Sequence, residues 1–186
     1  MGNETDLERS KSRGEGVGAF IDHMSANVSR AVRNGASWSR VVNEIAGDMQ
    51  KSSPMLRLLQ GDVGSGKTMV ALFVCLAAFK NGNQAAIMAP TEILSRQHYL
   101  TIAELIRNGP FKDLKVECLI SALKKSEKND IYSRLKQGEI DLLIGTHALL
   151  SETVDFKDLS LLVIDEQHKF GVRQRATLGS GGLLPH

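Results

Sequence analysis

The stretch "LLQGDVGSGKTMV", residues 58–70, decides the fold expected for this chain. Gly61, Gly66, Lys67 and Thr68 fit the phosphate-loop pattern, in which four variable residues separate the two glycines. Glycines let the backbone curl so that its N–H groups point inward, and the start of the following helix adds positive potential. The stretch therefore predicts a cradle for nucleotide phosphates between a strand and a helix.

Within this cradle, Lys67 would bring its charge to the β- and γ-phosphates, and Thr68 would offer its hydroxyl to Mg²⁺. An ordinary glycine-rich turn is the alternative, and the complete match to the pattern disfavours it. The residues expected to bind the nucleotide are Gly61, Asp62, Val63, Gly64, Ser65, Gly66, Lys67 and Thr68.

Two carboxylates end an apolar stretch further along the chain, "LLVIDE" at residues 161–166. A parallel strand there would deliver Asp165 and Glu166 to the sheet edge that carries the phosphate loop. Asp165 can hold the hydration shell of Mg²⁺, and Glu166 can orient and deprotonate an attacking water. A strand that merely ends in acidic turn residues is the alternative, but the pairing with a phosphate loop favours nucleotide hydrolysis.

Short apolar strands alternate with helices, which predicts an α/β fold with a parallel β-sheet and helices on both faces. In the helix expected at 91–107, Ile93, Leu100, Ala103 and Ile106 are expected to face inward. The expected strands are 56–60, 85–89, 116–120, 141–145 and 161–165, and the expected helices are about 37–50, 67–80, 91–107 and 122–137.

Composition sets the outer limits of these interpretations. The 186 residues are 42% hydrophobic, which is enough for a buried core, and the net charge of +2 means that any nucleic-acid site must be a local patch. Cys75 and Cys118 lie among apolar residues, which indicates buried thiols. No apolar run approaches the roughly 20 residues of a membrane span, and no secretory pattern opens the chain, so we expect a cytoplasmic protein without a membrane partner.

Four segments resemble the superfamily 2 helicases and translocases, and most closely the RecG-type branch-migration DNA helicases. They are "MLRLLQGDVGSGKT" (55–68), "MAPTEILSRQHY" (88–99), "LKKSEKNDIYSRLKQGEIDLLIGTHALL" (123–150) and "LLVIDEQHKFGVRQR" (161–175). The resemblance implies a RecA-like P-loop NTPase domain that uses ATP and Mg²⁺. It also implies the function of an ATP-dependent DNA helicase that remodels branched or forked duplex DNA in recombination and repair.

The resemblance also implies roles for individual residues. Gln167 and His168 match positions that relay the state of the γ-phosphate to the DNA-binding elements. The expected catalytic residues are Lys67, Asp165, Glu166, Gln167 and His168, and the expected metal ligands are Thr68 and Asp165. The residues that match two DNA-facing motifs are Pro90, Thr91, Glu92, Gly145, Thr146 and His147.

Several of these residues have a structural alternative. Thr91 is also the expected N-cap of helix 91–107. His98, His147 and His168 lack metal-ligand spacing, so each is expected to be hydrogen-bonded or exposed. The basic residues of helix 122–137 form either a solvated face or a contact with DNA phosphates.

The chain departs from the RecG pattern at both ends. Residues 1–34 are expected to be a polar, disordered tail followed by a helix of unassigned role, and Trp38 replaces a glutamine that helps these motors recognise adenine. Residues 35–186 are expected to be a partial first motor domain, incomplete at its C-terminus. The wedge domain and the second RecA-like domain, with its arginine finger, would be absent partners, so we expect this chain alone to hydrolyse little ATP.

Three alternatives to a RecG-type motor stay open. A non-catalytic nucleotide-binding remnant has no chemical need for Lys67, Asp165 and Glu166 together. The motor domain of a transcription-repair coupling translocase typically carries Glu where Gln167 stands. A phosphate-loop kinase does not account for the two DNA-facing motifs.

Overall fold

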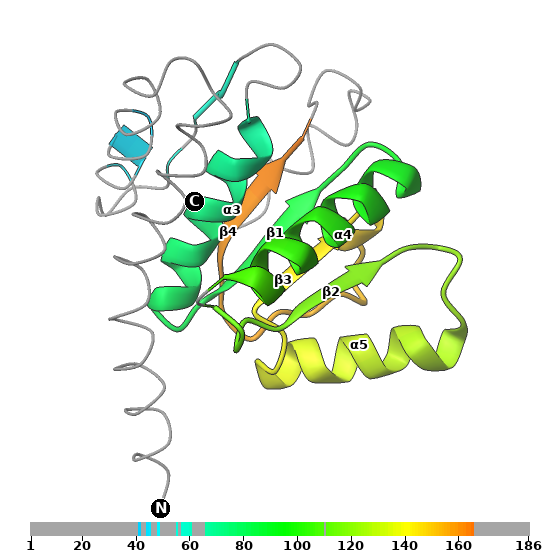
Figure 1. Cartoon of the computed structure of the whole chain (residues 1–186). Helices are drawn as coiled ribbons and strands as arrows, with labels where there is room; N and C mark the ends of the chain where they lie inside the picture. Colours follow the sequence, from blue (N-terminus) through cyan, green and yellow to red (C-terminus); the bar gives the residue numbers. More distant parts are fainter. Residues whose placement is uncertain are drawn as a thin grey trace, which may run out of the picture.

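The computed structural model describes residues 41, 44, 45, 48, 55, 57–60, 66–109 and 111–165. Strands and helices alternate along the described chain, and the strands assemble into one sheet (Figure 1). The strands are β1 (Gln84–Met88), β2 (Val116–Leu119), β3 (Leu142–Gly145) and β4 (Leu159–Ile164). The helices are α3 (Lys67–Lys80), α4 (Glu92–Asn108), α5 (Lys125–Gln137) and the short 3-10 helix η1 (His147–Leu150).

All strand pairs of the sheet are parallel, and their order is β2-β3-β1-β4. In the registers, Ala86 lies opposite Leu143 on one side and opposite Leu162 on the other. Every residue of β1 and β3 is buried, as expected for central strands that are covered on both faces. The predicted parallel α/β fold is therefore confirmed.

Side chains of the central strand alternate between two apolar layers. Ala85 and Ile87 join the core that contains residues of α3 and α4, whereas Ala86 and Met88 join the core that contains residues of α5. In Figure 1, α3 runs beside β4 and α4 lies close to β3, in agreement with their contacts. The period of two along a strand thus supplies both faces of the sheet with apolar side chains.

Helix α3 is the most deeply covered helix of the described chain, as its nearly continuous apolar sequence predicts. Leu72 and Leu76 are completely buried in it, and burial raises the pKa of the Cys75 thiol to about 12. Burial also raises the pKa of the half-buried Cys118 to about 11. Both thiols are therefore protonated at neutral pH, and Cys75 is buried as predicted, whereas Cys118 is only half-buried.

The predicted inner face of α4 is wrong in part. Ile106 is buried, but Ile93 is 78% exposed and Leu100 is 66% exposed, while Ser95 and Ile102 are the completely buried residues. The helix has apolar residues on two stripes, and the spacing of the sequence does not say which stripe meets the sheet. The hydrogen bond between Glu92 and Ser121 accompanies the rotation that the structure shows.

The predicted strand at 56–60 is also wrong for the residues that the structure describes. Residues 57–60 form no strand, and Leu58 is 70% exposed. An apolar run favours an extended chain, but a strand additionally needs a neighbour for its backbone hydrogen bonds. Among the described residues, β4 pairs with β1 and segment 57–60 pairs with no strand.

The remaining predictions for the N-terminal region are tested only at a few positions. Val41, Glu44, Ile45 and Asp48 are helical, and Ile45 is buried, in agreement with a helix at 37–50. Arg57 forms ion pairs with Glu44 at 2.8 Å and with Asp48 at 2.6 Å. The tail, the first helix and Trp38 lie outside the described residues.

Gln84, the first residue of β1, fastens the amino end of the sheet, which the sequence did not indicate. Its buried Nε2 group donates to the carbonyl oxygens of Leu135 and Ile140 at 3.0 and 2.7 Å. Its Oε1 atom accepts from the backbone N–H of Asp158 at 3.0 Å. One side chain thus connects the end of α5, the approach to β3 and the approach to β4.

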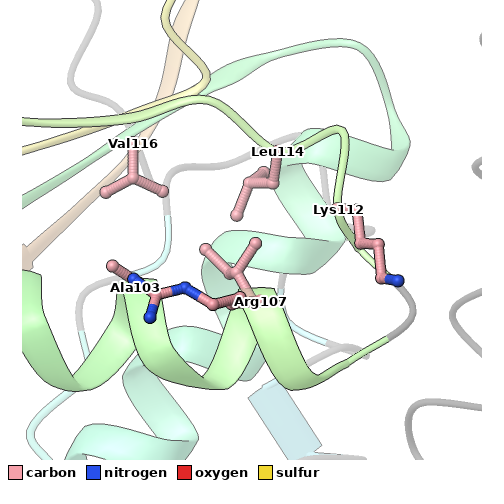
Figure 2. A pocket seen from close by; sticks show the side chains of 6 residues that line it. Ala103, Arg107, Lys112, Leu114 and Val116 are labelled. Atoms are coloured by element: carbon pink, nitrogen blue, oxygen red, sulfur yellow. The ribbon is translucent and has the colours of Figure 1, made fainter.

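The amino end of the sheet also carries a hollow in the protein surface. A hollow of about 390 Å³ lies between the C-terminal part of α4 and the start of β2, where Arg107 and Lys112 rim an apolar floor (Figure 2). Because Val116 begins its strand, this hollow lies at the amino end of the sheet, away from the edge expected to bind ligands.

Among the residues placed by the structure, no helix combines the length and apolar character that crossing a bilayer demands.

Replacing Gln84 with leucine should lower the free energy of unfolding by about 2–4 kcal/mol, because each buried partner left without a hydrogen bond costs about 1–3 kcal/mol. Urea unfolding followed by circular dichroism measures this loss. The same replacement at Gln97, which is exposed on α4, should change stability by less than about 0.5 kcal/mol. Equal losses in the two variants would contradict the role of Gln84.

Candidate nucleotide and DNA site

The parallel strands end together at one edge of the sheet, and the candidate site residues follow them there. The backbone N–H of Ala89, just after β1, donates to the carbonyl of Gly145 at 2.8 Å. The backbone N–H of Asp165, just after β4, donates to the carbonyl of Met88 at 2.8 Å. The hydrogen-bond ladders therefore extend past the strand ends and hold Asp165 at this edge.

Gly66, the last glycine of the candidate phosphate loop, has a backbone conformation that favours glycine. Gly66 has φ 82° and ψ 23°, in the left-handed region where glycine is favoured, and its carbonyl accepts from the N–H of Met69 at 2.8 Å. Lys67 and Thr68 are the first two residues of α3 and are half-buried. In Figure 1, α3 begins at the end of the sheet where β4 finishes, so both lie at the edge of Asp165.

Asp165 contacts a histidine from a distant part of the sequence. The Nε2 atom of His98, on α4, lies 2.8 Å from Oδ2 of Asp165, and the side chains are 14% and 27% exposed. His98 is thus hydrogen-bonded, as predicted, but its partner was missed because 67 residues separate the two. Both lie in segments that resemble helicase motifs, which is the signal that could have suggested the pair.

Thr91 is the N-cap of α4, as predicted. Its Oγ1 atom accepts from the backbone N–H of Leu94 at 3.2 Å. The carbonyl of Thr91 in turn accepts from the N–H and the hydroxyl of Ser95, each at 3.0 Å. The residue itself is exposed, so capping leaves it accessible from solvent.

Glu92 connects the start of α4 to the loop after β2. Its Oε1 atom accepts from the backbone N–H of Ser121 at 2.9 Å and from the Ser121 hydroxyl. The ammonium group of Lys128, on α5, donates to the Ser121 carbonyl at 2.8 Å. The hydrogen bonds from Ser121 hold the pKa of Glu92 below its ordinary value of 4.5.

The second DNA-facing motif contains two residues that shape the backbone. A Cβ atom on Gly145 would lie 2.7 Å from the carbonyl oxygen of Leu119 and 2.9 Å from Leu149 Cδ2, so a larger residue does not fit. Thr146 is buried and caps η1, with its Oγ1 atom 3.5 Å from the N–H of Ala148. His147, which follows them, is exposed.

The basic residues of α5 divide into two groups. Arg134 pairs with Glu117 at 2.7 Å, and Lys136 pairs with Asp155 at 2.8 Å. Lys124 and Lys125, at the N-terminal end of α5, are exposed close to Ser121 in the sequence. The C-terminal part of the helix is therefore a solvated face with paired charges, and a phosphate contact is better placed at its N-terminal end.

Several predicted site residues lie outside the described part of the chain. They are Gly61, Asp62, Val63, Gly64, Ser65, Glu166, Gln167 and His168. Within the described part, no group of three or more His, Cys, Asp or Glu residues could hold a metal ion. Mg²⁺ does not require such a cage, because it commonly binds through one or two protein oxygens together with phosphates.

Comparison with known proteins gives one consistent family. Residues 39–180 match the DEAD/DEAH box helicase family. The ATP-dependent DNA helicase RecG of Synechocystis sp. is 53% identical over 147 residues, which cover 79% of this chain and 17% of that protein. RecG of Streptococcus pneumoniae is 41% identical in an aligned region that covers 98% of this chain and 27% of that protein.

A solved structure of RecG bound to a three-way DNA junction is similar in fold, with a TM-score of 0.66 and 49% sequence identity. The similarity covers 72% of this chain and 18% of that chain. The sheet and its helices therefore match the RecA-like domain of a RecG helicase, and the chain spans only 17–27% of the length of the two curated relatives.

Because the ionised form of Glu92 accepts the Ser121 hydrogen bonds, its stabilising effect should depend on pH. A lowered carboxyl pKa means that this stability is fully present above about 4.5 and is lost as the pH falls through the folded-state pKa. We therefore expect Glu92→Gln to be less stable than the wild type at pH 7, with a difference that shrinks as the pH falls below 4.5. Urea midpoints measured from pH 7 to pH 3 test this expectation.

The matched control is Glu104→Gln, because Glu104 is exposed on the same helix. It should show no such convergence with falling pH. A constant difference between Glu92→Gln and the wild type across the whole range would rule out the ionised hydrogen-bond acceptor.

Proposed function

The chain belongs to the DEAD/DEAH box helicase family, and from this premise we propose that it is the nucleotide-binding side of an ATP-dependent DNA helicase of RecG type. One observation carries the proposal. Helix α3, which begins with Lys67, and strand β4, which ends before Asp165, present these residues at the same edge of the sheet. A nucleotide motor needs its phosphate cradle and its metal carboxylate at one edge.

In the proposed site, the phosphates of ATP lie at the start of α3. The N–H groups of the phosphate loop, from Gly61 onward, donate to phosphate oxygens, and the ammonium group of Lys67 balances their charge. The hydroxyl of Thr68 and the carboxylate of Asp165 would hold Mg²⁺, which when bound would supply positive charge to neutralise the phosphates.

The residues after Asp165 complete the proposed chemistry. Glu166 orients the attacking water and accepts its proton. Gln167 and His168 transmit the loss of the γ-phosphate to the DNA-binding elements. These roles are carried over from the family by motif, since the three residues lie outside the described part of the chain.

We further propose that DNA, in a branched or forked form, contacts the same edge of the sheet. The exposed residues Thr91 and His147 lie after β1 and β3, and the loop that leads into α5 follows β2 at the same edge of the sheet. The residues that shape this surface are Pro90, Glu92, Gly145 and Thr146. Glu92 fits the supporting role because its negative charge is used by Ser121 and would repel a DNA phosphate.

Unwinding needs more than this surface. In the proposed enzyme, the partners are a second RecA-like domain, which closes over the nucleotide, and a wedge domain that grips the DNA branch. Because DNA is the proposed partner, we also propose a cytoplasmic location.

Replacing Lys67 with alanine should weaken ATP–Mg²⁺ binding about 10- to 150-fold, since a hydrogen bond to a charged group contributes about 1.5–3 kcal/mol. Binding of a fluorescent ATP analogue to the 186-residue chain measures this change. Lys80→Ala, at the exposed far end of the same helix, should bind like the wild type. Equal affinities in the Lys67 and Lys80 variants would contradict the site.

The helicase activity itself can be tested in a chimera, in which this chain replaces the matching segment of the Synechocystis RecG. The chimera should unwind a three-way DNA junction with ATP. Asp165→Asn should lower the unwinding rate about 100-fold or more, because it removes a proposed metal ligand, and even the loss of a group that supports such a ligand costs about 10- to 100-fold. A folded chimera that binds ATP but does not unwind DNA would contradict a RecG-type function.

The same chimera tests the DNA surface. Lys124→Ala combined with Lys125→Ala should weaken DNA binding and reduce the slope of log affinity against log salt by about 2, because each lost phosphate contact lowers it by about 0.9. Lys136→Ala, which removes a lysine already paired with Asp155, should leave the slope unchanged.

A further inference from the structure

The contact between His98 and Asp165 carries an inference about how the metal ligand is held. An ionised carboxylate has only hydrogen-bond acceptors, so at the observed 2.8 Å the ring nitrogen Nε2 of His98 must donate its N–H to Asp165 Oδ2. This direction is the same whether the ring is neutral or protonated. Asp165 therefore receives a directed hydrogen bond at one defined oxygen.

The imidazole is itself held firmly by α4. His98 lies on the same face of the helix as Ser95 and Ile102, three residues before it and four residues after it, and both of these are completely buried. Ser95 is anchored by its hydroxyl, which donates to the Thr91 carbonyl at 3.0 Å. The ring is thus carried by the part of α4 that is packed most tightly against the sheet.

The backbone of Asp165 is held from the other side, by its N–H hydrogen bond to Met88. Once the backbone is fixed, the rotation of the side chain decides where the carboxylate points. Mg²⁺ demands nearly octahedral coordination and gives up its waters reluctantly, so the direction of a carboxylate ligand matters. Groups that hydrogen-bond to metal ligands commonly set that direction.

A simpler explanation is that the pair merely fastens α4 to β4. Two observations weigh against this explanation. The pair lies at the sheet edge where the nucleotide site is proposed, and both side chains keep some exposure to solvent, at 14% and 27%. Helix α4 is also fastened independently, by the burial of Ile102 and Ile106 and by the hydrogen bonds between Glu92 and Ser121.

We propose that His98 is a positioning residue for the magnesium site, and that its hydrogen bond to Oδ2 orients the carboxylate of Asp165 toward the ion that accompanies ATP. The proposal rests on the nucleotide site proposed above and adds to it a residue from the helix capped by Thr91. His98 does not touch the nucleotide. It acts through Asp165.

The test compares ATP binding in Mg²⁺ with ATP binding in EDTA, using the 186-residue chain. The ratio of the two affinities reports the contribution of the ion. His98→Ala should lower this ratio about 10-fold or more, the usual effect of losing a group that orients a metal ligand. The affinity in EDTA should stay within about twofold of the wild type, because no ion then depends on Asp165.

His98→Gln tests whether the hydrogen bond to Asp165, rather than the volume of the ring, accounts for the effect. The glutamine side-chain amide keeps an N–H donor. It should recover most of the ratio that His98→Ala loses. Gln97→Ala, a substitution at the exposed neighbour on the same helix, should match the wild type in both conditions. A His98→Ala variant that keeps the wild-type ratio, or that weakens both affinities equally, would overturn the proposal.

This experiment separates the two proposals. Failure of the wild-type chain to bind ATP at all would count against the nucleotide site, whereas binding with an unchanged ratio in His98→Ala would count against the positioning role alone. A second measurement needs no nucleotide. Urea midpoints of His98→Ala, Asp165→Ala and the double variant should be non-additive, with the double variant losing less than the sum of the single variants. Additive losses would show that the two side chains do not interact, and would overturn the positioning role by themselves.

Discussion

The parallel pairing of β1 with β3 on one side and with β4 on the other is the constraint on which the rest of the structure depends. Parallel strands bring their carboxyl ends to one edge, and the ladder continues past them through the hydrogen bonds of Ala89 with Gly145 and of Asp165 with Met88. Segments far apart in the sequence therefore meet at that edge. A strand paired in the opposite direction would carry its site residues to the other end of the sheet, beside Gln84 rather than beside the start of α3.

At this edge, residues that can meet a ligand alternate with residues that hold the backbone in place. Thr91 caps α4 and is exposed, whereas the next residue, Glu92, is engaged with Ser121. Gly145 leaves no room for a side chain, Thr146 is buried, and His147 is exposed. Each of the two motifs predicted to face DNA therefore combines exposed residues with supporting residues, and resemblance alone does not separate them. Burial and hydrogen bonding do.

The sequence predicted the β1, β3 and α3 segments to within one residue, because long apolar runs bounded by turn residues leave few alternatives. It failed where a local pattern had two solutions. Helix α4 carries two apolar stripes, and its rotation follows from the burial of Ser95 and the contacts of Glu92 and His98 rather than from hydropathy. Residues 57–60 have strand composition without a strand partner in the described chain.

The sequence by itself predicted the chemistry of the candidate site, because a phosphate loop and an Asp-Glu pair are recognised from residue types at short spacings. It also predicted the parallel α/β fold, from the alternation of apolar strands with helices, and the cap at Thr91, which depends on neighbours along the chain. Only the tertiary structure decided the partner of His98, the supporting role of Gln84 and the face that α4 turns to the sheet. Folding brings these atoms together from distant parts of the chain. His98 and Asp165 are 67 residues apart, and Gln84 and Asp158 are 74 residues apart. No local pattern encodes such a meeting, because the separation along the chain places no limit on which side chains meet in the folded protein.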